Sequence, residues 1–125
     1  MLIFDTSAII EIERENKYLI DKIEKLKENE KGLPKISFIT YFEFIEGIDK
    51  KIEKNKEKAR NFIKLFEVIQ TTNITAEKLV YLRRNYELPL PDLLIASQVM
   101  ENNGTLITKD KDFEQIKEIN KIILS

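Results

Sequence analysis

The sequence predicts an α/β fold in which helices flank a central parallel sheet. Short apolar runs that can form buried strands alternate along the chain with longer segments of helical periodicity. Such alternation favours parallel strands that are joined by right-handed helical crossovers. The 125 residues, of which 42% are apolar, are enough to bury one core without disulfides, so we expect residues 1–125 to form a single domain.

The first strand and the first two helices follow from apolar spacing. Leu2–Phe4 is a continuous apolar run, and Asp5 directly after it is a favoured cap for a helix that turns polar by Arg14. A second amphipathic helix ends near the breaker at 31–34. Its apolar side chains recur at helical spacing, at Leu19, Ile20, Ile23 and Leu26.

The middle of the chain adds two strands and two helices. Residues 36–39 form the second predicted strand, and Thr40 begins a helix rich in aromatic residues that stops near Gly47. A charged helix then runs from about 50 to 66, and the third predicted strand covers 67–70.

The last third of the chain completes the sheet. Thr75 is predicted to cap a further helix, and Pro89–Pro91 forms a rigid entry to the helix Asp92–Asn102. The fourth strand is predicted at Thr105–Thr108, after a helix-ending Asn-Gly pair, and an edge strand is predicted within residues 119–124.

Five acidic residues stand where these strands end or where the next helices begin. They are Asp5, Glu43, Asp92, Asp110 and Asp112. The carboxyl ends of parallel strands meet at one edge of the sheet, where open α/β folds build their sites. The sequence contains neither histidine nor cysteine, so a metal ion can be held only by oxygen ligands. Grouped carboxylates therefore favour Mg²⁺ or Mn²⁺.

Structural explanations also exist for Asp5 and Glu43. Asp5 can simply cap the first helix, and Glu43 can close a capping box with Thr40. Spacing along the chain leaves both explanations open.

Asp92 provides the strongest case for a functional carboxylate. It falls in the first turn of a predicted helix and continues the apolar face formed by Ile95, Ala96 and Val99. An inward-facing carboxylate is costly unless a cation compensates it. Asp110 and Asp112 follow the fourth strand, and we favour Asp110 as the direct ligand because it is nearer the strand end. Asp112 is then a supporting or alternative ligand.

Four segments, in order along the whole chain, resemble motifs of PIN-domain ribonucleases and in particular of VapC-type toxins. They are Leu-Ile-Phe-Asp-Thr-Ser at the start, Phe-Glu-Phe-Ile-Glu-Gly in the middle, Pro-Asp-Leu-Leu-Ile-Ala-Ser-Gln, and Asn-Gly-Thr-Leu-Ile-Thr-Lys-Asp-Lys-Asp-Phe. The last of these is the most specific. One departure is Pro91, because a small polar residue commonly precedes the acid in that family.

The resemblance implies a three-layer domain around a parallel sheet of about five strands. It places Asp5, Glu43, Asp92 and Asp110 among the metal-binding, catalytic acids, and Asp112 where many relatives also carry an acid. Supporting hydroxyls would come from Thr6 or Ser7 and from Thr108. The implied activity is that of an Mg²⁺- or Mn²⁺-dependent endoribonuclease that cleaves RNA with an activated water.

The same resemblance implies partners. A cognate antitoxin and a homodimer are expected, with the aromatic residues at 41–44 and the segment 19–26 as candidate contact surfaces. Candidate RNA contacts are Arg83, Arg84, Lys109 and Lys111. The lysine-rich stretch 50–60 is better explained as a solvated helix face with Lys/Glu pairs. No apolar run is long enough for a membrane span or a secretory signal, so we expect a cytoplasmic protein.

Three alternatives stay open at the level of the sequence. A receiver-type phosphoacceptor domain uses strand-end acids too, but the candidate acceptor, Asp49, follows a predicted helix rather than a strand. A PIN-like module that binds RNA or protein without cutting has no need of mutually repelling acids. A nuclease of RNA processing or decay has the same site as a toxin.

Overall fold

The computed structural model describes residues 1–124, without the side chain of Leu19, and contains a five-stranded sheet with the order β3-β2-β1-β4-β5. All pairings are parallel. The strands are β1 (Leu2–Phe4), β2 (Lys35–Ser37), β3 (Glu67–Ile69), β4 (Thr105–Thr108) and β5 (Asn120–Ile123). The predicted parallel α/β architecture is confirmed, including β4 at its predicted bounds and β5 at an edge.

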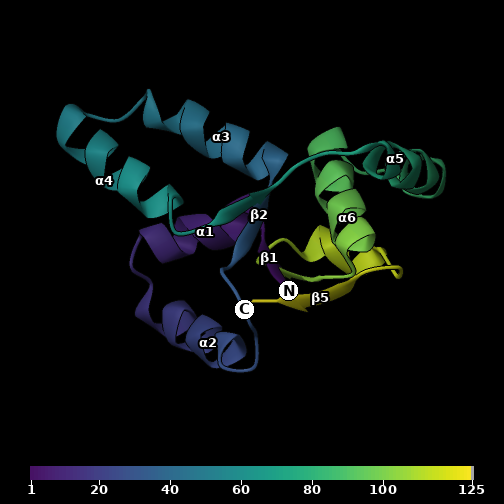
Figure 1. Ribbon diagram of the computed structural model, residues 1–125, viewed down its shortest axis with the longest axis horizontal. Coiled ribbons are helices and arrows are strands. Elements are labelled where there is room, and N and C mark those ends of the chain that lie inside the picture. The colour runs from purple at the N-terminus through teal and green to yellow at the C-terminus, as the bar shows by residue number, and fades with distance from the viewer. Residues whose placement is uncertain (125) are drawn as a thin grey trace.

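Helices cover both faces of this sheet, which gives three layers (Figure 1). They are α1 (Thr6–Glu13), α2 (Lys17–Lys27), α3 (Phe38–Ile48), α4 (Glu53–Ile63), α5 (Asn73–Asn85) and α6 (Leu90–Asn102), with a short 3-10 turn, η1 (Lys111–Gln115). Among residues 1–124, no helix combines the length and apolarity that crossing a membrane requires.

Strand β1 divides the interior into two cores. Its side chains alternate between the two faces of the sheet, so Leu2 and Phe4 belong to one cluster and Ile3 to the other. The first cluster takes apolar residues from α1 to α4, and the second takes them from α5, α6 and η1. Because both faces of β1 are covered, its three residues are all buried, as expected of a central parallel strand.

Several predicted boundaries are wrong, and the start of α3 is the most informative. Strand β2 ends at Ser37, whose Oγ accepts a hydrogen bond from the Thr40 backbone N–H at 3.1 Å and so caps the helix. Helix α3 therefore begins at Phe38 rather than at Thr40. The apolar run 36–39 resembled a strand, but Phe38 is exposed on the helix instead of buried in the sheet.

The remaining differences are smaller. Helix α4 is shorter than the predicted span 50–66, and Thr72 caps α5 in a capping box with Thr75, the predicted cap. Helix α6 begins at Leu90, which makes Pro91 its second residue. The prediction that the side chain of Leu19 lies on the inner face of α2 falls outside the part of the chain that the structure describes.

The turn between α6 and β4 brings β4 against β1. Asn103 ends α6 in the left-handed conformation, with a φ of 51°, and Gly104 follows it. A Cβ atom at Gly104 would lie 2.8 Å from Cδ1 of Ile3, so the buried Ile3 side chain would have to move to admit a side chain at this position. The parallel register, with Phe4 opposite Ile107, then places the carboxyl ends of β1 and β4 side by side, which is where the acids lie.

Candidate metal centre

Asp5 joins the end of β1 to the start of α1. Its Oδ1 accepts hydrogen bonds from the Ala8 backbone N–H at 3.0 Å and from Ser7 Oγ at 2.7 Å, and its Oδ2 accepts one from Thr108 Oγ1. The capping role is therefore real. Burial raises the pKa of Asp5, while the hydrogen bonds from Thr108, Ser7 and Ala8 oppose that rise. The residue as a whole is only 4% exposed.

Two hydroxyls tie this carboxylate to the end of β4. Ser7 Oγ accepts a hydrogen bond from the Lys109 backbone N–H at 2.9 Å, and Thr108 Oγ1 accepts one from the Asp110 backbone N–H at 2.9 Å. The two hydroxyl oxygens are 3.3 Å apart. Residues a hundred positions apart in the sequence are thus held in one small polar network, which fixes the backbone from which Asp110 projects.

Three carboxylates form a tight group beside Asp5. Asp92, Asp110 and Asp112 each offer an oxygen, and these oxygens all lie within 4.8 Å of one another. Asp92 comes from the first turn of α6, and Asp110 caps η1 by accepting a hydrogen bond from the Asp112 backbone N–H at 2.9 Å. The preference for Asp110 over Asp112 as a direct ligand stays a prediction, because both carboxylates belong to the group.

Electrostatics shows that the acids affect one another. Partial burial, followed by the charges of Asp110, Asp5, Asp112 and Glu43, raises the pKa of Asp92 from its ordinary 3.8 to about 6. Asp110 likewise contributes to the raised pKa of Asp5. Like charges at short range are unfavourable without a counterion, so the group has a strong electrostatic reason to bind a cation.

Glu43 borders this group from α3. Its Oε1 accepts a hydrogen bond from Thr6 Oγ1 at 2.8 Å, so the hydroxyl of the first helical residue holds it. The capping box that the sequence suggested with Thr40 is wrong, because α3 begins at Phe38 and places Glu43 in the second turn. Glu43 is exposed, and its charge contributes to the raised pKa of Asp92.

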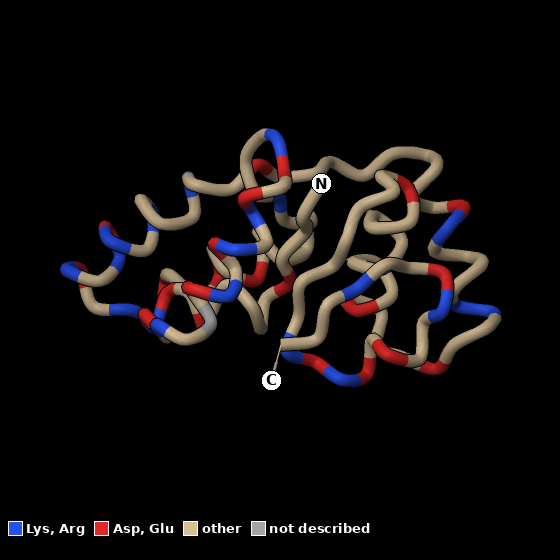
Figure 2. The backbone as a smooth tube through the Cα atoms, turned by 90° about the horizontal axis from the view of Figure 1, so that it is seen from below, with Lys and Arg blue, Asp and Glu red and all other residues tan. Residues whose placement is uncertain are grey.

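The candidate RNA contacts differ in their surroundings. Arg83 and Arg84 lie exposed in the last turn of α5, and Lys111 is exposed at the start of η1. Lys109 is half-buried, with its Nζ 3.6 Å from Oε1 of Glu11. Basic and acidic residues are otherwise interleaved over the molecule (Figure 2), in agreement with the net charge of −1.

Sequence reasoning missed Glu11. Its carboxylate pairs with Lys109 and, at 3.9 Å, with Nη1 of Arg14, and it accepts a hydrogen bond from Asn16 Nδ2 at 2.9 Å. The Asn16 hydrogen bond, together with the Lys109 and Arg14 charges, lowers the pKa of Glu11. Glu11 lies one helical turn after Ser7 on the same face of α1, and this spacing could have indicated that its side chain lies near the end of β4.

The donor set fits a hard divalent cation. Every candidate ligand is a carboxylate, and the whole sequence offers no imidazole or thiolate as an alternative donor. Three carboxylates with one raised pKa provide the charge that a cation would neutralise. Mg²⁺ binds in proteins through a small number of carboxylates and keeps several waters, which an open group at the edge of a sheet permits.

The family follows from a match over nearly the whole chain. The family model of the PIN domain matches residues 2–119. This chain belongs to the PIN domain family. The structure agrees, because the parallel five-stranded sheet and its three layers are those of that family.

Solved structures and one curated protein resemble this PIN domain. VapBC2 from Rickettsia felis, bound to a DNA fragment of its promoter, matches with a TM-score of 0.84 and 21% identity, covering 99% of this chain and 98% of that one. A toxin–antitoxin complex from Klebsiella pneumoniae matches with a TM-score of 0.78 and 27% identity, covering 98% and 96%. Transcription initiation factor IIB from Methanocaldococcus jannaschii is 31% identical over 128 residues, or 96% of this chain and 19% of that protein. The PIN domain thus spans about a fifth of the length of that relative.

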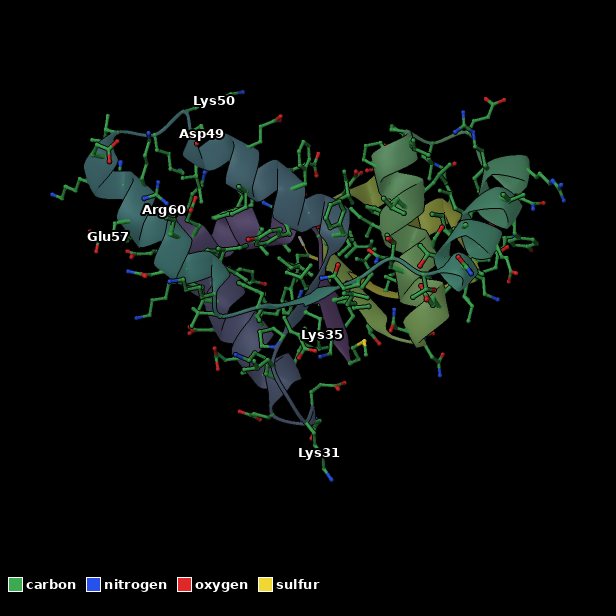
Figure 3. The ribbon with its side chains drawn as sticks, turned by 45° about the horizontal axis from the view of Figure 1, so that its top comes forward. Lys31, Lys35, Asp49, Lys50, Glu57 and Arg60 are labelled. Carbon is green, nitrogen blue, oxygen red and sulfur yellow. The ribbon has the colours of Figure 1, made fainter. Side chains whose placement is uncertain are left out.

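The family assignment removes the receiver-type alternative. Asp49, which that alternative needed as its acceptor, is the C-cap of α3 rather than the end of a strand. Figure 3 shows it at the turn between α3 and α4, beside Lys50 and opposite Arg60 on α4. The charged residues of this region form surface pairs such as Lys56–Glu53, with Nζ and Oε1 3.3 Å apart.

Proposed function

We propose that this PIN domain is an Mg²⁺- or Mn²⁺-dependent endoribonuclease and acts as the toxin of a toxin–antitoxin pair. The observation that carries the proposal is the group of Asp92, Asp110 and Asp112 at the carboxyl edge of the sheet, with Asp5 and Glu43 beside it. The likeness to VapBC structures over the full chain supports the toxin role.

Each residue has a distinct part in this proposal. Asp92, Asp110 and Asp112 hold the cation, with Asp5 as a further ligand that Ser7 and Thr108 keep oriented. When bound, a divalent cation supplies an activated water at neutral pH and offsets charge on the phosphate. Glu43 Oε1 is engaged by Thr6, so Oε2 is the atom that would take the proton of the attacking water.

The expected products follow from the attacking group. Because water attacks instead of a ribose 2′-hydroxyl, cleavage should leave 5′-phosphate and 3′-hydroxyl ends. Arg83, Arg84, Lys109 and Lys111 are the proposed contacts to RNA phosphates around the acidic group.

Partners belong to the same proposal. We expect a homodimer and an antitoxin that covers the acidic group. Among the aromatic residues of α3, Phe44 is part of the core, whereas Phe42 is exposed and free to contact a partner. As part of the same proposal, we expect the toxin to act in the cytoplasm.

The test is cleavage of a mixed pool of tRNA and structured RNA with Mg²⁺, Mn²⁺ or EDTA. Wild type, Asp92→Asn and the matched control Asp21→Asn are compared, since Asp21 is an exposed acid of α2 outside the group. We expect metal-dependent cutting by wild type and the control and its loss in Asp92→Asn. If wild type neither cuts RNA nor binds Mn²⁺, the chain is a non-catalytic PIN module.

A further inference from the structure

An open cavity of about 330 Å³ lies between α1 and α3. Its near end is formed by Thr6 and Glu43, the hydrogen-bonded pair that borders the carboxylates. Arg14 and Lys51 also line it. We call this cavity the α1–α3 trough.

The two walls of the trough run along α1 and α3, away from Thr6 and Glu43. Thr6, Ile10 and Arg14 are four residues apart on one face of α1 and its C-cap, so they cover about 12 Å of one wall. On the opposite side Glu43 and Gly47 are one turn apart on α3, and Lys51 lies beyond its end. The lining therefore passes from the carboxylate of Glu43 at the near end to Arg14, Lys51 and Glu13 at the far end.

The charge of the far end favours an anion. Lys51 Nζ is 3.6 Å from Oε1 of Glu13, and Arg14 has only a long contact of 3.9 Å to Glu11 with 71% of its side chain exposed. Such surface pairs are weak and exchange readily for a better partner. Glu43 belongs to the proposed catalytic residues. The rest of the lining carries two positive charges, those of Arg14 and Lys51, and one negative charge, that of Glu13.

The floor of the trough is apolar and open. Ile10 and Phe44 contribute carbon surface, and a Cβ atom at Gly47 would meet no heavy atom within 4 Å. The volume lies within the range of small-ligand sites and admits one unstacked nucleotide rather than a duplex. Single-strand binding sites combine a basic groove with side chains, usually aromatic, on which bases lie; here the carbon surface of Ile10 and Phe44 takes that place beside the cations.

We propose that the α1–α3 trough binds the nucleotide next to the scissile phosphate of single-stranded RNA. Arg14 and Lys51 contact its phosphate, and its base lies over Ile10 and Gly47. The inference rests on the proposed nuclease function and adds the binding site that selects an unpaired nucleotide. It also makes Arg14 and Lys51 positioning residues rather than catalytic ones.

Gly47 offers a test in which the fold is not at risk. Gly47→Leu fills the trough without a backbone clash, and replacing a helical glycine should leave the Tm equal to or above that of wild type. Gly47→Ala is the matched control that keeps most of the space. Binding of a fluorescein-labelled single-stranded RNA is measured with Mg²⁺ in the Asp92→Asn background, where the RNA stays intact.

We expect Gly47→Leu to weaken RNA binding about tenfold and Gly47→Ala to change it by less than about twofold. Arg14→Gln with Lys51→Gln should reduce the slope of log K against log salt by about 0.7, because the contacts to one phosphate of a single strand are lost. Arg60→Gln, an exposed residue of α4 outside the trough, should leave the slope unchanged.

Two results would overturn the inference. One is RNA binding that is unaffected by Gly47→Leu. If this variant keeps RNA binding but loses binding of an antitoxin, the trough holds a protein segment instead of a nucleotide. The other is an unchanged salt slope in the Arg14, Lys51 double variant. A wild type that binds RNA through the trough but never cuts it would refute the nuclease and leave the binding site standing.

Discussion

Neutralising Asp92 should stabilise the metal-free protein, and the effect should depend on pH. The carboxylate of Asp92 is ionised at the cost of partial burial and of four neighbouring negative charges. Asp92→Asn removes that cost while keeping the size of the side chain. Most substitutions of half-buried residues destabilise a protein, so a gain in stability would be diagnostic.

The magnitude follows from the raised pKa. A change from 3.8 in the unfolded chain to about 6 in the folded one corresponds to an upper limit of about 3 kcal/mol. Solvent screening of a partly exposed group reduces this to about 1 to 2 kcal/mol. The lost charge at the N-terminal turn of α6 offsets about 0.3 to 1 kcal/mol, so a net gain of about 1 kcal/mol is expected at pH 7.5.

The sign of the pH dependence is fixed by the direction of the pKa change. Well below pH 3.8 the carboxyl is protonated in both states and exerts no penalty. As pH rises from about 4 to about 6 the unfolded chain ionises first, so the folded state loses stability, and above about 6 the penalty stays constant. Urea unfolding in EDTA at pH 4.5 and 7.5 should therefore show that the advantage of Asp92→Asn over wild type grows with pH. Asp21→Asn should show no such growth. An equal difference at both pH values would refute the electrostatic coupling.

Three other substitutions probe the same edge of the sheet. Thr108→Val removes the hydroxyl that donates to Asp5 and should cost about 1 to 3 kcal/mol in thermal unfolding; an unchanged Tm would show that this bond adds nothing. Glu43→Gln should lower kcat about 100-fold while Mn²⁺ affinity, measured by electron paramagnetic resonance, stays within about threefold. A parallel loss of Mn²⁺ affinity would instead make Glu43 a ligand. Gly104→Ala should destabilise the fold by about 1 to 3 kcal/mol because its Cβ would contact Ile3, and calorimetry would detect this; full stability would mean that the Ile3 side chain moves aside without cost.

The sequence alone determined the class of the fold and the composition of the site. Apolar runs followed by acids located β1 and β4, and the absence of histidine and cysteine restricted the metal donors to oxygen. These features are local, because burial pattern and residue chemistry are written along a few neighbouring positions. The start of α3 escaped such reasoning, because the apolar run 36–39 satisfies a strand and an exposed helix face equally well.

Only the tertiary structure decided that the acids meet. The order β3-β2-β1-β4-β5 places the end of β4 beside that of β1, and α6 returns Asp92 to the same edge. Strand order is set by long-range packing of two cores, which no short window of sequence contains. The same packing brings Thr6 to Glu43, 37 residues away, and opens the trough between α1 and α3. Local patterns specify the ligands, whereas the geometry that makes them a site arises from contacts between distant parts of the chain.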